Sequence, residues 1–261
     1  MSDAPSDPTT RPPAAWSPEE LHENPHESSE KAGKVRAMFS AISASYDLNN
    51  RLHSFGRDQA WRRQAVRLAR VGPQDEILDV ACGTGDLSEA LMAAGAARVV
   101  GGDFTPEMLD QARRKAVRLP EGRRPVYEHA DAMSLDYPDE SFDVVSIAFG
   151  IRNVSDPAVA IREFARVLRP GGRLVILEFA EPSFAPIRWA NQLYTSRIMP
   201  WTASMVARDE SGAYRYLPRS IETFLTPAQL GQLVQEAGMT VERQVRMTFG
   251  VCVATLGVRP S

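Results

Sequence analysis

Short β-rich runs alternate with helical stretches through the middle of this chain, and this alternation limits the fold more than any other feature. The β-rich runs cover residues 76–80, 98–102, 125–129, 143–148 and 173–179, and helical patterns cover 86–94, 106–119 and 157–168. Strands that alternate with helices form a parallel sheet with both faces covered. We therefore predict an α/β, Rossmann-like fold with helices on both faces of the sheet.

The end of the chain has a different pattern. A helix is predicted over residues 227–237, followed by β-rich runs at 241–247 and 251–258 that Thr248-Phe249-Gly250 connects. A link this short suits an antiparallel hairpin. The complete prediction is a mostly parallel, seven-stranded sheet that ends in an antiparallel hairpin.

One domain is expected over residues 29–261, because no second apolar block of comparable size exists. Residues 1–28 are rich in Pro, Ser and acidic side chains, which predicts a disordered tail. Helical spacing predicts a cap of two helices over residues 30–70. Residues 181–224 interrupt the alternation, and we interpret them as an insertion on the substrate side of the sheet.

Composition narrows the function. A net charge of −3 and only two cysteines argue against a nucleic-acid partner and a disulfide framework, and no metal site is predicted. No apolar run reaches the roughly 18 residues of a membrane span, and no secretory signal is evident. We expect a cytoplasmic protein with a small-molecule partner.

The turn Asp79-Val80-Ala81-Cys82-Gly83-Thr84-Gly85 follows the first predicted strand. Gly83 and Gly85 permit a sharp bend and a close approach to a ligand, although an ordinary strand-to-helix turn has the same appearance. A dinucleotide-binding turn would require a third glycine where Ser88 stands, and Asp86 would repel a pyrophosphate. A different nucleotide-like ligand is indicated.

Acidic residues gather at the predicted strand ends. Asp79 and Asp86 flank the turn, Asp103 follows the second strand and Asp131 follows the third. S-adenosylmethionine has a sulfonium and an ammonium group against one carboxylate, so carboxylates would attract it. Ligands of open α/β sheets bind at these strand ends. We predict an S-adenosylmethionine site that includes Asp79, Gly83 and Gly85.

The spacing also suggests individual contacts. Asp103 lies 18 residues after Gly85, near the separation at which an acidic residue binds a ribose diol. Asp131 and Ala132 are expected to face the adenine edge. For any one such aspartate, a helix cap is the alternative reading.

Several segments together resemble the quinone-biosynthesis C-methyltransferases, which methylate the ring of demethylmenaquinone and of ubiquinone precursors. The resemblance runs from about residue 34 to 256 and rests on residues 38–50, 54–56 with 61–63, 79–86, 149–154 and 214–221. It implies a class I S-adenosylmethionine-dependent methyltransferase fold and cofactor contacts at Thr84, Asp103, Asp131 and Ala132. Ala148 departs from the pattern, because some ubiquinone-pathway members have a cofactor-contacting serine there.

If the substrate is a quinol, Arg152 and Asn153 are candidates to act on it, because they follow the fourth predicted strand at the same edge of the sheet as the cofactor site. A guanidinium could stabilise a developing phenolate, and an amide could bind the other quinol oxygen. The alternative for Arg152 is a surface salt bridge to Asp156. Arg152 stays protonated and cannot be a general base, so the base is unassigned.

Other aromatic residues are candidates for enclosing the ring. Tyr46, Tyr214 and Tyr216 could close over cofactor and quinol, with core packing as the alternative. The stretch 187–201, with Trp189 and Trp201, could contact the inner face of the plasma membrane, where a prenylated quinol resides; the alternatives are a pocket wall or a homodimer contact.

The favoured reaction is methylation of demethylmenaquinol to menaquinol. Ala148 and an arginine-rich composition with three lysines favour it weakly over C-methylation of 2-polyprenyl-6-methoxy-1,4-benzoquinol. A sterol or phenol acceptor is a further alternative. A non-catalytic S-adenosylmethionine-binding subunit of a quinone-synthesis complex is the remaining one.

Overall fold

The structure is a computed structural model, and it describes residues 15–17, 19–194 and 212–261. Seven strands form one sheet in the order β3-β2-β1-β4-β5-β7-β6 within these residues. Their bounds are β1 Glu76–Val80, β2 Arg98–Asp103, β3 Val126–His129, β4 Phe142–Ala148, β5 Leu168–Phe179, β6 Thr240–Met247 and β7 Cys252–Val258. Strand β7 pairs antiparallel with β5 and β6, and the other pairs are parallel. The predicted fold class is confirmed.

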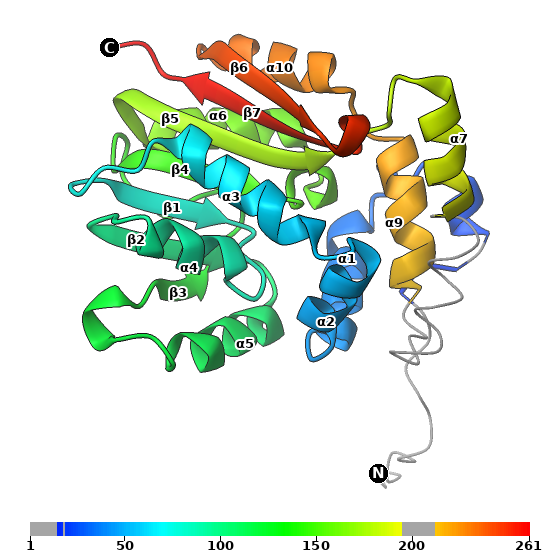
Figure 1. Ribbon diagram of the computed structural model, residues 1–261, viewed down its shortest axis with the longest axis horizontal. Coiled ribbons are helices and arrows are strands. Elements are labelled where there is room, and N and C mark those ends of the chain that lie inside the picture. The colour runs from blue at the N-terminus through cyan, green and yellow to red at the C-terminus, as the bar shows by residue number, and fades with distance from the viewer. Residues whose placement is uncertain (1–14, 18, 195–211) are drawn as a thin grey trace, which may run out of the picture.

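Helices cover both faces of the sheet (Figure 1). The bounds are α4 Asp86–Ala93, α5 Pro106–Ala116, α6 Pro157–Val167 and α10 Pro227–Glu236. Successive strand residues point to opposite faces, so Ile77 packs with α4 whereas Leu78 packs with α6 and α10. Helix α6 has a side-chain cap, because Asp156 accepts hydrogen bonds from Ala158 N and Val159 N.

The N-terminal cap has three helices in the described part, not the expected two. They are α1 Lys31–Ile42, α2 Tyr46–His53 and α3 Arg57–Ala69. The helical conformation is interrupted between α2 and α3 at Phe55 and Gly56, whose φ angles are 52° and 71°. A left-handed backbone cannot continue an α-helix, and this interruption has no signature in the apolar spacing.

The prediction of a tail through residue 28 is wrong from residue 15 onward. Trp16 is 1% exposed and stacks on Tyr216 with ring centroids 5.0 Å apart. A short 3-10 helix, η1 Glu20–His22, follows it. One large aromatic side chain can anchor a segment whose average composition favours disorder. Residues 1–14 lie outside the described residues.

Two helices of the predicted insertion are described, α7 Ala185–Leu193 and α9 Ala213–Glu222. They lie with α1 and α2 beyond the end of the sheet where β5 finishes (Figure 1). The 3-10 helices η2 Glu121–Arg123, η3 Ile151–Asn153 and η5 Thr248–Gly250 complete the elements. None of the helices in the described ranges is long and apolar enough to span a bilayer.

Candidate functional site

A cavity lies at the carboxyl ends of β1, β2, β3 and β4, where the strand order reverses. We call it the cofactor cleft. Each strand end contributes residues to its wall: Val80, Ala81 and Gly83 after β1, Asp103 to Thr105 after β2, Ala130 to Met133 after β3, and Ala148 to Gly150 after β4. The structure therefore has a cavity at the strand ends, where the sequence predicts the ligand site.

Asp103 is 8% exposed at the wall of this cleft. Its Oδ2 accepts from Gly83 N and its Oδ1 accepts from Thr105 N, each at 2.8 Å. Burial raises the pKa of this carboxyl from 3.8. Each carboxylate oxygen can accept a second hydrogen bond, so Asp103 can still bind a diol.

Asp131 and Ala132 line the cleft after β3, the strand next to β2. Asp131 Oδ1 accepts from Met133 N at 2.9 Å, and this bond fixes the turn. The backbone carbonyl of Asp131 accepts from Ser134 N at 3.1 Å. The residue is thus both a turn-forming group and an acceptor at the wall.

The two glycines of the first turn, Gly83 and Gly85, have different surroundings. Gly83, with φ 55°, lines the cleft, and a Cβ there would approach Tyr46 Cε1 to 3.8 Å. Gly85, with φ 85°, packs under Tyr127, whose hydroxyl oxygen would lie 2.2 Å from an added Cβ. Only Gly83 faces the cleft, and Gly85 is required by packing.

Thr84 and Asp86 point away from the cleft. Thr84 donates a short hydrogen bond to Asp47, and Lys115 Nζ forms ion pairs with Asp47 and Asp86. Thr84 is not among the residues that line the cleft, so the structure does not place the expected cofactor contact of this residue there. Asp86 is neutralised by Lys115 and adds little attraction for a cation in the cleft.

Asp79 also lies behind the turn. It is 1% exposed, and its carboxylate oxygens accept from Ser88 Oγ at 2.6 Å and Ser146 Oγ at 2.7 Å. Burial raises its pKa to about 6. The expected acidic contribution to the cleft therefore comes from Asp103 and Asp131, and Asp79 supports the strand ends from inside.

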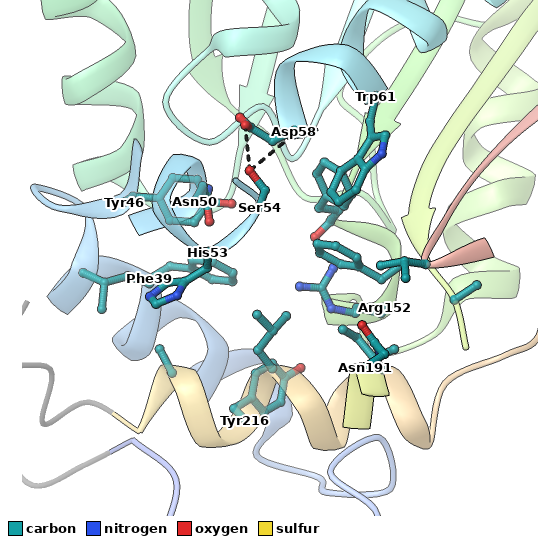
Figure 2. A pocket seen from close by; sticks show the side chains of 18 of the residues that line it. Phe39, Tyr46, Asn50, His53, Ser54, Asp58, Trp61, Arg152, Asn191 and Tyr216 are labelled. Atoms are coloured by element: carbon teal, nitrogen blue, oxygen red, sulfur yellow. Dashed lines mark hydrogen bonds between the residues drawn. The ribbon is translucent and has the colours of Figure 1, made fainter. Parts of the chain in front are cut away.

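A second cavity adjoins the first, and we call it the ring chamber. Helices α1, α2, α3, α7 and α9 contribute to its wall together with Phe149, Arg152 and Phe179 from the sheet side. Apolar side chains dominate the wall, among them Met38, Ile42, Trp61 and Leu217. Figure 2 shows Trp61, Arg152 and Tyr216 around this space. A planar apolar ring fits such a chamber.

Phe39, Tyr46 and Phe149 line both cavities and form the wall between them. Phe39 and Tyr46 meet edge to face at 5.9 Å, and Phe149 has a left-handed backbone with φ 58°. Sequence reasoning assigned no role to Phe39 or Phe149. Phe149 lies directly before Gly150 at a strand end, which is a signal that could have identified it.

Arg152 lines the ring chamber and is 5% exposed. Its Nη1 donates to Phe149 O at 2.8 Å and to Glu178 Oε1 at 2.7 Å. The suggested surface salt bridge to Asp156 is wrong, because Asp156 caps α6. The Nε atom of Arg152 is buried and has no hydrogen-bond partner. A guanidinium at the wall of an apolar chamber suits an oxyanion.

Asn153 lines the cofactor cleft, so the two adjacent residues face different cavities. Asn153 Nδ2 donates to Phe149 O at 3.3 Å, and its Oδ1 accepts from Tyr216 OH at 3.0 Å. Burial raises the pKa of Tyr216 to about 12, so this phenol is a hydrogen-bond donor. Tyr46 and Tyr216 line the ring chamber as expected, whereas the side chain of Tyr214 lies outside the described residues.

The comparisons with known proteins agree with this geometry. The sequence pattern of the ubiE/COQ5 methyltransferase family matches residues 27–259. A demethylmenaquinone methyltransferase of Thermus thermophilus is 46% identical over 85% of this chain and 100% of its own length. A ubiquinone/menaquinone biosynthesis C-methyltransferase UbiE of Hahella chejuensis is 37% identical, over 88% of this chain and 93% of its own length.

A solved structure of similar fold is the magnesium protoporphyrin IX methyltransferase of Synechocystis with bound S-adenosylmethionine. Its TM-score is 0.60 at 17% identity, and the match covers 89% of this chain and 99% of that chain. At this identity the likeness concerns the fold alone. It agrees with the class I methyltransferase architecture that the family resemblance implies.

Proposed function

Because the chain belongs to the ubiE/COQ5 methyltransferase family, we propose that it transfers the methyl group of S-adenosylmethionine to a ring carbon of demethylmenaquinol. The observation that carries this proposal is the shared wall of the two cavities. A cofactor bound at the strand ends and a ring in the chamber would meet at Phe39, Tyr46 and Phe149. Holding both reactants at one boundary supplies much of the rate of a transfer reaction.

The residues of the cleft fit the proposed cofactor. Asp103 has acceptor capacity for a ribose diol, and Asp131 with the Ala132 N–H would bind the adenine edge. Gly83 leaves room for the ligand beside Tyr46. When bound, S-adenosylmethionine supplies an electrophilic methyl group on a sulfonium.

Arg152 would act on the substrate. A quinol carbon becomes a stronger nucleophile when a neighbouring hydroxyl loses its proton, and the guanidinium would stabilise the resulting phenolate. Glu178 holds Nη1 at 2.7 Å and leaves other N–H groups for this purpose. Asn153 is bound to Phe149 O and to Tyr216, which supports a positioning role at the shared wall.

The apolar surface beside the chamber supports contact with a membrane. Phe55, Trp189 and Leu193 are 77%, 67% and 44% exposed, and Phe55 contacts the chamber residue Tyr194 at 5.5 Å between centroids. Exposed arginines lie near these residues in the chain: Arg51 in α2, Arg57 in α3 and Arg188 in α7. Apolar side chains with arginines beside them suit an anionic bilayer, in which a prenyl tail would remain. Trp201, the other tryptophan of interest, lies outside the described residues.

A direct assay tests which quinol the protein methylates. The purified protein would be given S-adenosylmethionine and either demethylmenaquinol or 2-polyprenyl-6-methoxy-1,4-benzoquinol, and products would be read by mass spectrometry. We expect methylation of demethylmenaquinol with the higher kcat/KM. Preference for the benzoquinol would reverse the substrate assignment, and cofactor binding without any transfer would indicate a non-catalytic subunit.

A vesicle-binding assay tests whether the apolar surface with Phe55 and Trp189 contacts a membrane. Co-sedimentation with vesicles that contain anionic lipid should fall when Phe55 and Trp189 are both replaced by Ser. Sedimentation velocity on the same variant separates the alternative, because loss of a dimer with unchanged vesicle binding would assign this face to a second copy. Replacement of the exposed Val117, which directly follows α5, by Ser is the matched control.

A further inference from the structure

His53 is the last residue of α2 and lies at the wall of the ring chamber. Its backbone carbonyl accepts from Tyr194 OH at 3.1 Å, which connects the end of α2 to the segment after α7. Figure 2 shows His53 and Arg152 on opposite sides of the chamber, and both residues line it. A ring in the chamber would lie between them.

The other titratable groups of the described chamber wall are less suited to accept a proton from a quinol. Asp58 is 4% exposed and accepts from Arg62 Nη1 at 2.8 Å and from Ser54 Oγ at 2.9 Å, so a strong partner already holds its charge. The remaining groups are two arginines and three phenols whose pKa burial raises: Arg62, Arg152, Tyr46, Tyr194 and Tyr216. Arginines stay protonated and neutral phenols are weak bases.

The surroundings of His53 suit a group that begins neutral and ends charged. Burial lowers its pKa below 6.5, so the imidazole is neutral at physiological pH. Its place at the C-terminus of α2 stabilises the imidazolium that a proton transfer would form, because the helix dipole is negative there. Arg152 across the chamber would favour the phenolate that remains.

We propose that His53 is the catalytic base that accepts the hydroxyl proton of the quinol, a step that rests on the proposed function. As the O–H proton passes to the imidazole, the adjacent ring carbon forms a C–C bond to the methyl group and the C–S bond breaks. The sulfonium becomes a neutral thioether. The methylated carbon then loses its hydrogen as a proton to solvent while the oxygen recovers the proton from His53, so one proton is released per turnover.

His53→Gln is the first test, because glutamine preserves size and polarity but cannot accept the proton. We expect kcat for demethylmenaquinol to fall by about 10²–10⁴-fold at neutral pH. A ring-halogenated demethylmenaquinol, whose hydroxyl is more acidic, should lose much less. The cofactor Kd and melting temperature should stay near wild type. His26→Gln is the matched control, since His26 is also half-buried but does not line the chamber.

Other outcomes overturn the proposal. An unchanged kcat removes His53 from the reaction, and an equal loss for both quinols shows a structural role. The wild-type pH profile provides a second measurement should the variant not fold: kcat/KM must decline on the acidic side below the ordinary histidine pKa of 6.5, and a flat profile there contradicts the proposal. Failure of the wild type to methylate any quinol would instead refute the proposed function.

Discussion

Arg152 Nη1 lies 2.7 Å from Glu178 Oε1, and both side chains are almost fully buried beside the ring chamber. The backbone N–H of Arg152 also donates to Glu178 Oε2 at 3.3 Å. A carboxylate at the end of β5 thus fixes a guanidinium that follows β4. This arrangement gives the planar donor one orientation toward the chamber before any substrate arrives.

Arg152→Lys should therefore impair the reaction and spare the cofactor. A lysine keeps the charge, but it cannot bind Phe149 O and Glu178 and still present a planar donor to a phenolate. We expect kcat to fall by about 10²–10³-fold, the cost of losing one oxyanion donor. Isothermal titration should give an unchanged cofactor Kd. The control is Arg166→Lys on the remote side of α6, and equal turnover of the two variants would remove Arg152 from the mechanism.

Asp103→Asn should weaken cofactor binding. The carboxylate accepts from Gly83 N and Thr105 N and would also accept from a ribose, so the amide loses an ionic acceptor worth about 1.5–3 kcal/mol. This loss corresponds to about 10–10²-fold in Kd. Asp110→Asn on the exposed face of α5 is the matched control, and identical Kd values for the two variants would exclude Asp103 as a ligand.

The same variant has a characteristic pH dependence. Burial raises the pKa of Asp103 from 3.8, so its carboxyl is protonated at a higher pH than an ordinary aspartate. Wild-type affinity should therefore fall as the pH decreases through that raised pKa, because the neutral acid is a weaker acceptor. Asp103→Asn should lack this decline, which calorimetric titrations over an acidic pH series can measure.

Gly85→Ala should destabilise the protein. An added Cβ would lie 2.2 Å from the Tyr127 hydroxyl oxygen and 2.7 Å from Cζ, at a backbone φ of 85°. Overpacking of this kind costs about 1–3 kcal/mol, in addition to the left-handed strain. Urea denaturation measures the loss. Gly95→Ala isolates the strain, because φ is 109° and no atom lies within 4 Å of its Cβ position. Equal losses for the two variants would contradict the packing role of Gly85.

The sheet could be predicted because its strands are buried on both faces and are separated by helices with clear N-terminal signals, as at Asp156 and Pro157. Gly83, Asp103 and Asp131 reach one cleft for the same reason, since parallel strands end at one edge. Asp79 illustrates the limit. It is one residue from Val80 at the cleft, but side chains alternate along a strand, so its carboxylate faces Ser88 and Ser146.

The contacts made by the N-terminal segments could not be predicted, because they join residues far apart in the chain. Trp16 packs on Tyr216, and Phe39 and Phe149 both line the two cavities. Helical periodicity identifies an apolar face but does not say what covers it. Composition likewise averages over residues 1–28 and gives no weight to a single anchoring tryptophan.

Asp79→Asn should stabilise the protein above pH 6. The folded pKa of Asp79 is about 6 against an ordinary 3.8, because burial favours the neutral acid. Below the ordinary value both states are protonated; between the two values only the folded state holds the proton; above the folded pKa the buried carboxylate lowers the free energy of unfolding. The difference between the two pKa values corresponds to about 3 kcal/mol in the free energy of unfolding.

Asparagine at position 79 can still accept a hydrogen bond from one of Ser88 and Ser146 and donate to the other. Urea denaturation at about pH 8 should show the variant more stable than wild type, with a smaller difference at about pH 5. A variant less stable at both pH values would show that the ionised form is the one the fold requires.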